Sequence, residues 1–229
     1  IDANGGNQWL AVSGNHIAVG APNEGSGSGR VAWYADTSVN GNWATVNSGF
    51  FDEITTNIPE NDSQQRFGAS VAMTKGVLVI GAPGADIETG GTYGGDGANY
   101  GVVRVIQWSE GSTDAPNPNT GLLDTLSGNP DNSSGTGTPT ANAFFGAAVD
   151  IDYYSATPSI STSYRYTIVV GAPGEGGAGE AYVYQSATSS PSAFGVTTNI
   201  YNHASSGAHY GLAVAVSQGR VIIGAPDHT

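Results

Sequence analysis

The stretch "VLVIGAP", residues 77–83, places four consecutive apolar residues in front of a Gly-Ala-Pro tripeptide. Val and Ile favour strands, whereas Pro lacks the N–H group that would continue a ladder of backbone hydrogen bonds. Close variants are "HIAVGAP" (16–22), "TIVVGAP" (167–173) and "RVIIGAP" (220–226). The sequence therefore predicts four strands that end in the same way, which indicates a repeated structural unit.

A second motif precedes the tripeptide in three of the four units. Each copy begins with an aromatic residue followed by Gly and then by small residues: "RFGASVAMT" (66–74), "FFGAAVDID" (144–152) and "HYGLAVAVS" (209–217). The two motifs have the same spacing in the second and fourth units, and the third unit carries an insertion between them. In the first unit the corresponding position is Asn7, so the aromatic–glycine pair is absent there.

Further β-forming runs follow the first three tripeptides, at "RVAWY" (30–34), "GVVRVIQW" (101–108) and "EAYVY" (180–184). A weaker run comes next, for example "NWATV" (42–46) after Asn40-Gly41, which is a strong signal for a hairpin turn. We therefore predict an all-β chain of repeated four-stranded antiparallel sheets. The predicted units are 7–65, 66–143, 144–208 and an incomplete 209–229.

The apolar runs indicate how these sheets are packed. Val77 to Ile80, Ile168 to Val170 and Val221 to Ile223 do not alternate with polar residues, as strands of a sandwich with one wet face would. Blades arranged around an axis cover both faces of each strand, and their innermost strands are crowded. The small residues after each aromatic–glycine pair suit that innermost place. We predict a β-propeller, of which about three and a half blades are present.

The two motifs together resemble the FG-GAP repeat, the blade unit of the integrin α-subunit propeller and of many secreted microbial and algal proteins. The resemblance covers nearly the whole chain, as three units and the start of a fourth. The residues that match the motif are Phe67, Gly68, Gly81, Ala82, Pro83, Phe145, Gly146, Gly171, Ala172, Pro173, Tyr210, Gly211, Gly224, Ala225 and Pro226.

The resemblance implies an extracellular or cell-surface seven-bladed propeller that serves adhesion or protein contact without catalysis. In integrin-type blades, the loop between the first two strands holds calcium through a run like DxNxDGxxD. The corresponding loops here lack three alternating carboxylates, and calcium requires six or more oxygen ligands. Asp150 and Asp152 stand where a calcium loop would begin, but we expect a solvated strand end there. The chain is therefore similar to a calcium-poor variant of the repeat.

Composition excludes several classes of partner and site. The 229 residues carry a net charge of -13 with six Lys and Arg in total, so the chain has no basic footprint for nucleic acid or for an anionic membrane surface. No apolar run is long enough for a transmembrane helix. The absence of cysteine excludes disulfides and thiolate metal sites.

Catalytic motifs are equally scarce. "GEGGAG" (174–179) matches a dinucleotide-binding pattern, yet it leads into a predicted strand where such a site requires a helix. No GxSxG or HExxH sequence occurs. The histidines, His16, His203, His209 and His228, are scattered, and we expect them at the surface. We predict no enzyme and no cofactor, although a propeller site can gather residues from distant blades.

Glycan binding is the main alternative function. Tyr153, Tyr154, Tyr164 and Tyr166 lie in a Ser- and Thr-rich insertion, a composition suited to stacking and adaptable hydrogen bonds. We expect the strand aromatics, Trp33, Trp108, Tyr182 and Tyr184, to pack between blades instead. The acidic loop 84–101, with Asp86, Glu88 and Asp96, is interpreted as a variable loop or as a ligand or subunit contact.

Two sequons, at Asn61 and Asn132, are candidate glycosylation sites if the chain passes through a eukaryotic secretory pathway. The second begins the Ser-, Thr- and Pro-containing stretch 132–143, whose composition is that of an O-glycosylated linker.

Counting strands gives an expectation about partners. The sequence begins at the first strand of a blade, about residues 8–12, and ends after the second strand of the fourth unit. Such an arrangement leaves open sheet edges and an uncovered blade face, which invite association. We expect the rest of a longer polypeptide, neighbouring copies or another protein to cover them.

Overall fold

The computed structural model describes residues 9–36, 46–52, 65–86, 98–109, 121–127, 140–155, 157, 163–189, 191, 194–202 and 207–227. Within these ranges the chain is all-β, and its helical content is limited to short 3-10 turns such as Gly25–Gly27 and Glu175–Gly177. The expected fold class is confirmed at this level.

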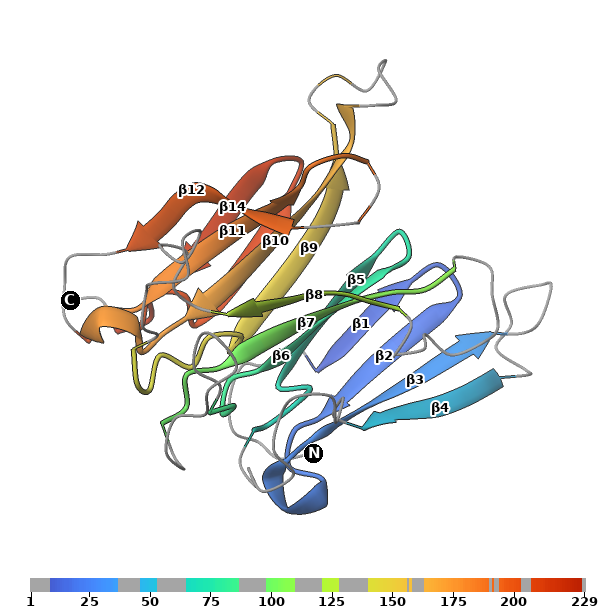
Figure 1. Ribbon diagram of the computed structural model, residues 1–229, viewed down its shortest axis with the longest axis horizontal. Helices are drawn as coiled ribbons and strands as arrows, with labels where there is room; N and C mark the ends of the chain where they lie inside the picture. The colour runs from blue at the N-terminus through green and yellow to red at the C-terminus, as the bar shows by residue number, and fades with distance from the viewer. Residues whose placement is uncertain are drawn as a thin grey trace.

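The strands form antiparallel sheets in which chain order equals spatial order (Figure 1). Sheet 1 contains β1 (Leu10–Ser13), β2 (His16–Ala21), β3 (Arg30–Asp36) and β4 (Val46–Asp52). Sheet 2 contains β5 (Ser70–Thr74), β6 (Val77–Ala82), β7 (Val102–Gln107) and β8 (Leu122–Ser127). Sheet 3 contains β9 (Ala148–Tyr154), β10 (Arg165–Ala172), β11 (Glu180–Ser186) and β12 (Phe194–Asn202), and sheet 4 contains β13 (Ala213–Ser217) and β14 (Arg220–Gly224).

The four Gly-Ala-Pro strands are the second strands β2, β6, β10 and β14, as the repeat predicts. Of the expected fourth strand of the first unit, 42–46, only Val46 is described, and it is the first residue of β4; residues 42–45 lie outside the described residues. β3 continues past "RVAWY" to Asp36, and its antiparallel register pairs Asp36 with Val46 and Arg30 with Asp52. Among the described residues, this pairing runs from Val46 to Asp52. The Asn40-Gly41 turn lies outside the described residues.

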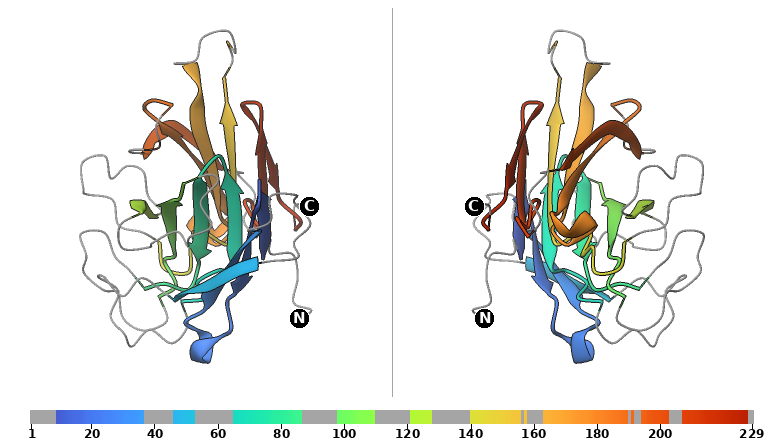
Figure 2. Two further views of the ribbon diagram at one scale, coloured as in Figure 1. Left: turned by 90° about the vertical axis from the view of Figure 1, so that its right-hand side faces the viewer. Right: turned by 90° about the vertical axis from the view of Figure 1, so that its left-hand side faces the viewer.

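Consecutive sheets pack against one another through their first strands. β1 contacts β5, β5 contacts β9, and β9 contacts β13. The last strands β4, β8 and β12 form the opposite edges of their sheets. Figure 2 shows the same succession of sheets from two sides. We call the face that a sheet turns toward the preceding sheet in the chain its front face, and the other its back face. In sheet 1 the back face is the one that packs on sheet 2, and the front face is the opposite one.

Apolar clusters fill the spaces between consecutive sheets. Side chains alternate along a strand, so Leu78 and Ile80 of β6 pack with sheet 1 while Val77 and Val79 pack with sheet 3. All residues of β6 are buried. Burying one such aliphatic side chain contributes about 1.5–3 kcal/mol. The expectation that this unalternating strand is covered on both faces is confirmed.

The last strand departs from that expectation. Ile222 of β14 is 73% exposed, whereas Val79 and Val169, which hold the same repeat position, are fully buried. Val221 and Ile223 face sheet 3 and are half-buried. The prediction that Val221 to Ile223 are covered on both faces is wrong, because no described element lies on the back face of sheet 4.

Candidate functional site

The Gly of each tripeptide in sheets 1 to 3 lies against the Gly of the aromatic–glycine pair in the following sheet. A Cβ atom on Gly81 would lie 2.0 Å from the carbonyl oxygen of Gly146, a distance that no side chain tolerates. The same contact joins Gly20 to Gly68 and Gly171 to Gly211, at 1.9 and 1.8 Å. We call these three contacts the joints. Glycine is required there because two backbones meet.

A third glycine completes each joint from the preceding sheet. Gly101, which precedes β7, has a φ of +86°, and a Cβ on it would lie 2.1 Å from the carbonyl oxygen of Phe145. The N–H of Phe145 donates to the carbonyl oxygen of Tyr100, at 3.1 Å. Gly29 against Phe67 and Gly179 against Tyr210 repeat this arrangement.

Within each unit, the aromatic–glycine pair is tied to its own tripeptide. The N–H groups of Gly68, Gly146 and Gly211 donate to the carbonyl oxygens of Gly81, Gly171 and Gly224, at 2.9–3.0 Å. Each pair therefore links its own tripeptide to that of the preceding sheet. The residues before the three aromatics, Arg66, Phe144 and His209, all have positive φ values, so the chain accepts a left-handed backbone here three times.

The side chains of the motif are buried where two sheets meet, and they are more exposed in sheet 4, whose back face no other described sheet covers. Phe67 and Phe145 are at most 1% exposed, and Phe145 meets Tyr182 edge-on with ring centroids 5.4 Å apart. Ala82, Pro83, Ala172 and Pro173 are buried as well, whereas Tyr210, Gly224 and Ala225 are half-buried and Pro226 is exposed. The strand aromatics Trp33, Trp108, Tyr182 and Tyr184 pack in the clusters between sheets, as predicted.

The weak metal candidates Asp150 and Asp152 bind backbone groups of the next sheet. Asp150 accepts hydrogen bonds from the N–H of Val216 (2.7 Å) and of Ile151 (2.9 Å), and Asp152 accepts one from the N–H of Gln218 (2.6 Å). The expectation of a solvated strand end is wrong for Asp150, which is partly buried against β13, whereas the bond of Asp152 to the turn after β13 is exposed. Burial raises the pKa of Asp150, and the backbone hydrogen bonds oppose this rise.

Replacing Asp150 by Ala is expected to lower the free energy of unfolding by about 1–3 kcal/mol, because the N–H of Val216 loses its acceptor. Alanine is the residue at this repeat position in the other three sheets, so the backbone accepts it. Urea unfolding measures the change, and Asp152→Ala, which removes a more exposed bond, is expected to cost less. A melting temperature that rises with calcium in the parent and not in Asp150→Ala would contradict this structural role.

Glu175 is a buried carboxylate that the sequence did not single out. Thr140 donates a hydrogen bond to Oε1, while Oε2 is buried without a hydrogen-bond partner among the described residues. The equivalent residue of sheet 1, Glu24, forms an ion pair with Arg30 at 2.7 Å, but sheet 3 has Glu180 at the position of Arg30. Burial raises the pKa of Glu175, and the negative charge of Glu180 raises it further.

Glu175→Gln is expected to stabilise the chain at neutral pH. Because the folded pKa of Glu175 lies above its unfolded value, the parent's stability falls as the pH rises from about 4.5 through the folded pKa. The amide carries no charge and removes this loss, so the two chains should converge in melting temperature near pH 4. Thermal melts across this pH range measure the difference. A parent that is more stable than the variant at pH 7 would contradict the assignment.

The tyrosines of the third unit gather on the β9–β10 hairpin, which projects beyond the other strands (Figure 1). The ring of Tyr153 stacks on that of Tyr164, with centroids 5.1 Å apart, and lies 4.6 Å from Tyr166. Tyr166 is buried and its hydroxyl donates to the carbonyl oxygen of Lys75 in sheet 2. The expected cluster therefore exists, but its inner member fastens two sheets together.

His16 is buried, contrary to the expectation of a surface position. Its ring lies between those of Trp33 and Trp108, with centroids 6.4 and 5.7 Å away, in the space between sheets 1 and 2. His209 is exposed, as expected, and its Nδ1 lies 2.6 Å from Asp227 Oδ2. His203 and His228 lie outside the described residues.

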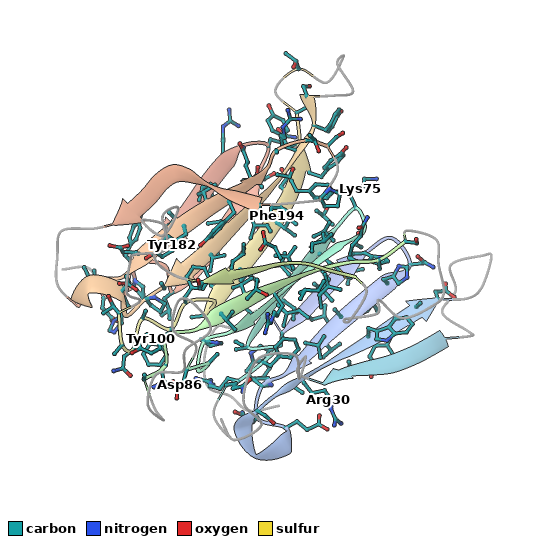
Figure 3. The ribbon with its side chains drawn as sticks, in the orientation of Figure 1. Arg30, Lys75, Asp86, Tyr100, Tyr182 and Phe194 are labelled. Atoms are coloured by element: carbon teal, nitrogen blue, oxygen red, sulfur yellow. The ribbon has the colours of Figure 1, made fainter. Side chains whose placement is uncertain are left out.

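The remaining candidates belong largely to undescribed parts of the chain. Asn61, Asn132, Glu88 and Asp96 lie outside the described residues. Asp86 is buried at the base of the acidic loop and accepts a hydrogen bond from the N–H of Asn99 at 2.5 Å (Figure 3). "GEGGAG" (174–179) forms a 3-10 turn that leads into β11, as the sequence indicated.

Asp124 is a further contact residue that the sequence did not reveal. Its Oδ2 accepts a hydrogen bond from the N–H of Phe194 at 3.1 Å, which ties β8 of sheet 2 to β12 of sheet 3. A carboxylate inside an otherwise apolar run, "LLDTL" at 122–126, was the available signal.

Within the described ranges, no three His, Asp or Glu side chains cluster closely enough to bind a metal ion. The same part of the chain contains no helix that is long and apolar enough to cross a membrane. No protein-family model matches the chain, and no curated protein sequence matches it.

Proposed function

We propose that the chain is part of an FG-GAP β-propeller, and that this propeller acts outside the cell as a non-catalytic module for adhesion or structural assembly. The observation that carries the proposal is the joint, which recurs between each pair of consecutive sheets with the same three glycines. A propeller has this construction, since each blade packs on the next around an axis. The extracellular location rests on the resemblance of the motifs, and the calcium-poor character rests on the loops that lack three alternating carboxylates.

Adhesion or assembly is the function that such a scaffold supports best. Asp150, Asp152 and Asp124, the carboxylates that bind backbone groups of neighbouring sheets, are used to hold the sheets in place. Large apolar side chains remain exposed on the first and last sheets, and exposed apolar patches mark interaction surfaces.

The test of this function is whether beads coated with the purified protein bind to cells that produce the protein. We expect the coated beads to bind these cells, and we expect the binding to persist in a calcium chelator. Labelling of intact cells with a membrane-impermeant reagent should reach the protein. Binding no stronger than that of beads coated with heat-unfolded protein, or labelling only after lysis, would contradict the proposal.

Glycan binding is the second candidate, and the tyrosine stack on the β9–β10 hairpin is the observation that favours it. Tyr164 stacks on Tyr153 and is half-buried, and a partly exposed tyrosine ring is a group on which a sugar can stack. A glycan array probed with the parent and with Tyr164→Ala tests this function, and Tyr34→Ala on sheet 1 is the matched control. Glycan binding that is lost in Tyr164→Ala and kept in Tyr34→Ala would support this second function. An array on which the parent binds no glycan would exclude it.

A further inference from the structure

Among the described residues, three of the four exposed large apolar side chains lie on two particular faces, the front face of sheet 1 and the back face of sheet 4, and the fourth, Leu212, precedes β13. Leu10 and Val12 of β1 are 60% and 55% exposed, and Ile222 of β14 is 73% exposed. Between consecutive sheets, a front face and a back face are always packed together. The two end faces are therefore the two halves of a contact that the chain already makes three times.

The first two strands of sheet 1 pair on its front face as those of sheet 2 do, although the first unit lacks the aromatic–glycine pair. Leu10 pairs with Val19 as Val71 pairs with Ile80 in sheet 2, where both side chains are buried. An open hollow of about 550 Å³ lies beside Leu10 and Val19, and its walls include Trp9, Ala21 and Pro22. The first sheet thus presents an apolar surface with room for side chains from another sheet.

The back face of sheet 4 supplies the matching surface. Ile222 holds the repeat position of Val79, and Val79 packs in one cluster with Ile168 and Val170 on the front face of sheet 3. The residues of sheet 1 at the positions of Ile168 and Val170 are Ile17 and Val19. Ile222 of one chain therefore fits against Ile17 and Val19 of another.

The extent and the charge of the two faces agree with this fit. Sheet 4 consists of β13 and β14, which correspond to the first two strands of a complete sheet. The exposed apolar residues of sheet 1, Leu10 and Val12, lie on its first strand, and their partners on β2 are half-buried. The chain has 19 Asp and Glu residues, yet β1, β2, β13 and β14 contain none of them, and Glu24, which lines the hollow, forms an ion pair with Arg30. The net charge of -13 is thereby kept away from the strands that would meet.

We propose that two copies of this chain associate head to tail, with the back face of sheet 4 in one copy packed on the front face of sheet 1 in the other. The contact is carried by the apolar side chains of the two faces, since the first unit has Asn7 in place of the aromatic–glycine pair. The proposal rests on the proposed function and specifies its partner as a second copy. Because the two surfaces differ, the contact is heterologous, and it extends copies into rows or closes them into a ring.

Sedimentation velocity over a range of concentrations tests the association. The parent chain is expected to gain mass with concentration, and high salt should not weaken the association because the contact is apolar. Leu10→Glu and Ile222→Glu should each remain monomeric, since each places a charge on one of the two faces. Gln107→Glu, which adds the same charge at an exposed position of β7, should behave as the parent does.

Mixing the two variants distinguishes the head-to-tail contact from a symmetric one. Leu10→Glu keeps an intact sheet 4 and Ile222→Glu keeps an intact sheet 1, so an equal mixture should form dimers and nothing larger. Thermal melts confirm that each variant is folded. If the parent precipitates, the same pattern is expected in solubility, with each variant soluble and the control insoluble.

A parent that stays monomeric at all concentrations would overturn the proposal, and so would variants that associate as the parent does. Self-association of one variant with no mixed dimers between the two variants would also overturn it, because that pattern belongs to a symmetric contact. A folded monomer whose coated beads still bind cells would leave the proposed function standing. Head-to-tail dimers without bead binding would instead remove the adhesion function alone.

Discussion

Gly81→Ala is expected to lower the free energy of unfolding by more than about 3 kcal/mol. The new methyl group would lie 2.0 Å from the carbonyl oxygen of Gly146 and 2.4 Å from Ser70 Oγ. Overpacking a core by one methyl group costs about 1–3 kcal/mol when side chains can move aside. Here the main obstruction is backbone, so sheets 2 and 3 must separate. Urea unfolding followed by tryptophan fluorescence measures the loss.

Gly224→Ala is the matched control, since it changes the same motif position in the last sheet. The nearest atom to its new methyl group is the Cβ of Ala213, at 3.4 Å, and no following sheet is present among the described residues. We expect a change within about 0.5 kcal/mol at protein concentrations low enough to keep the chains apart. Equal losses for the two substitutions would show that the glycine serves its own strand rather than the joint.

Phe145→Ala is expected to cost about 3–5 kcal/mol, as truncation of a buried aromatic side chain does. The ring is fully buried between sheets 2 and 3, and it meets Tyr182 and Tyr184 edge-on with centroids 5.4 and 6.2 Å apart. Truncation leaves a cavity that the rigid joint beside it prevents from closing. Thermal and urea unfolding measure the loss.

Phe145→Leu keeps most of the side-chain volume and is expected to cost clearly less than Phe145→Ala. The comparison separates loss of packing from loss of the aromatic character that gives the repeat its name. A loss below about 1 kcal/mol for Phe145→Ala would mean that the ring does not hold the two sheets together.

The strand order could be predicted from the sequence because each unit carries its own signals. The apolar runs before Gly81 and Gly171 and the Pro after each tripeptide are local, and local patterning places strands well. The close backbone approach at the glycines was also predictable in kind. The residue that this glycine contacts could not be predicted. The glycine that meets Gly81 belongs to the next unit, and spacing within one unit gives no information about packing between units.

The same limit explains the errors at the candidate site. Asp150 and Asp152 alternate along one strand, a pattern shared by calcium loops and by carboxylates that cap a neighbouring strand. The neighbouring N–H groups of Val216 and Gln218 come from the following unit. A comparison of repeat positions held a usable signal, since Asp150 replaces the alanine of the other three first strands.

His16 was misplaced for a related reason. Its repeat position matches that of Arg220, an exposed residue at the start of β14, and this match indicated a polar surface position. Sheet 2 covers the back face of sheet 1, however, and brings Trp108 against the histidine ring. Repeat position predicts which strand a residue occupies, but its burial depends on whether another sheet follows.

A cryo-electron microscopy structure of the protein in its natural assembly tests the central claim most directly, since the claim is that the joints order the sheets as blades around one axis. We predict successive sheets around that axis with β1, β5, β9 and β13 innermost, and with Gly224 and Ile222 seated against a further sheet. Sheets that share no axis, or Gly224 and Ile222 facing solvent in the complete assembly, would contradict it.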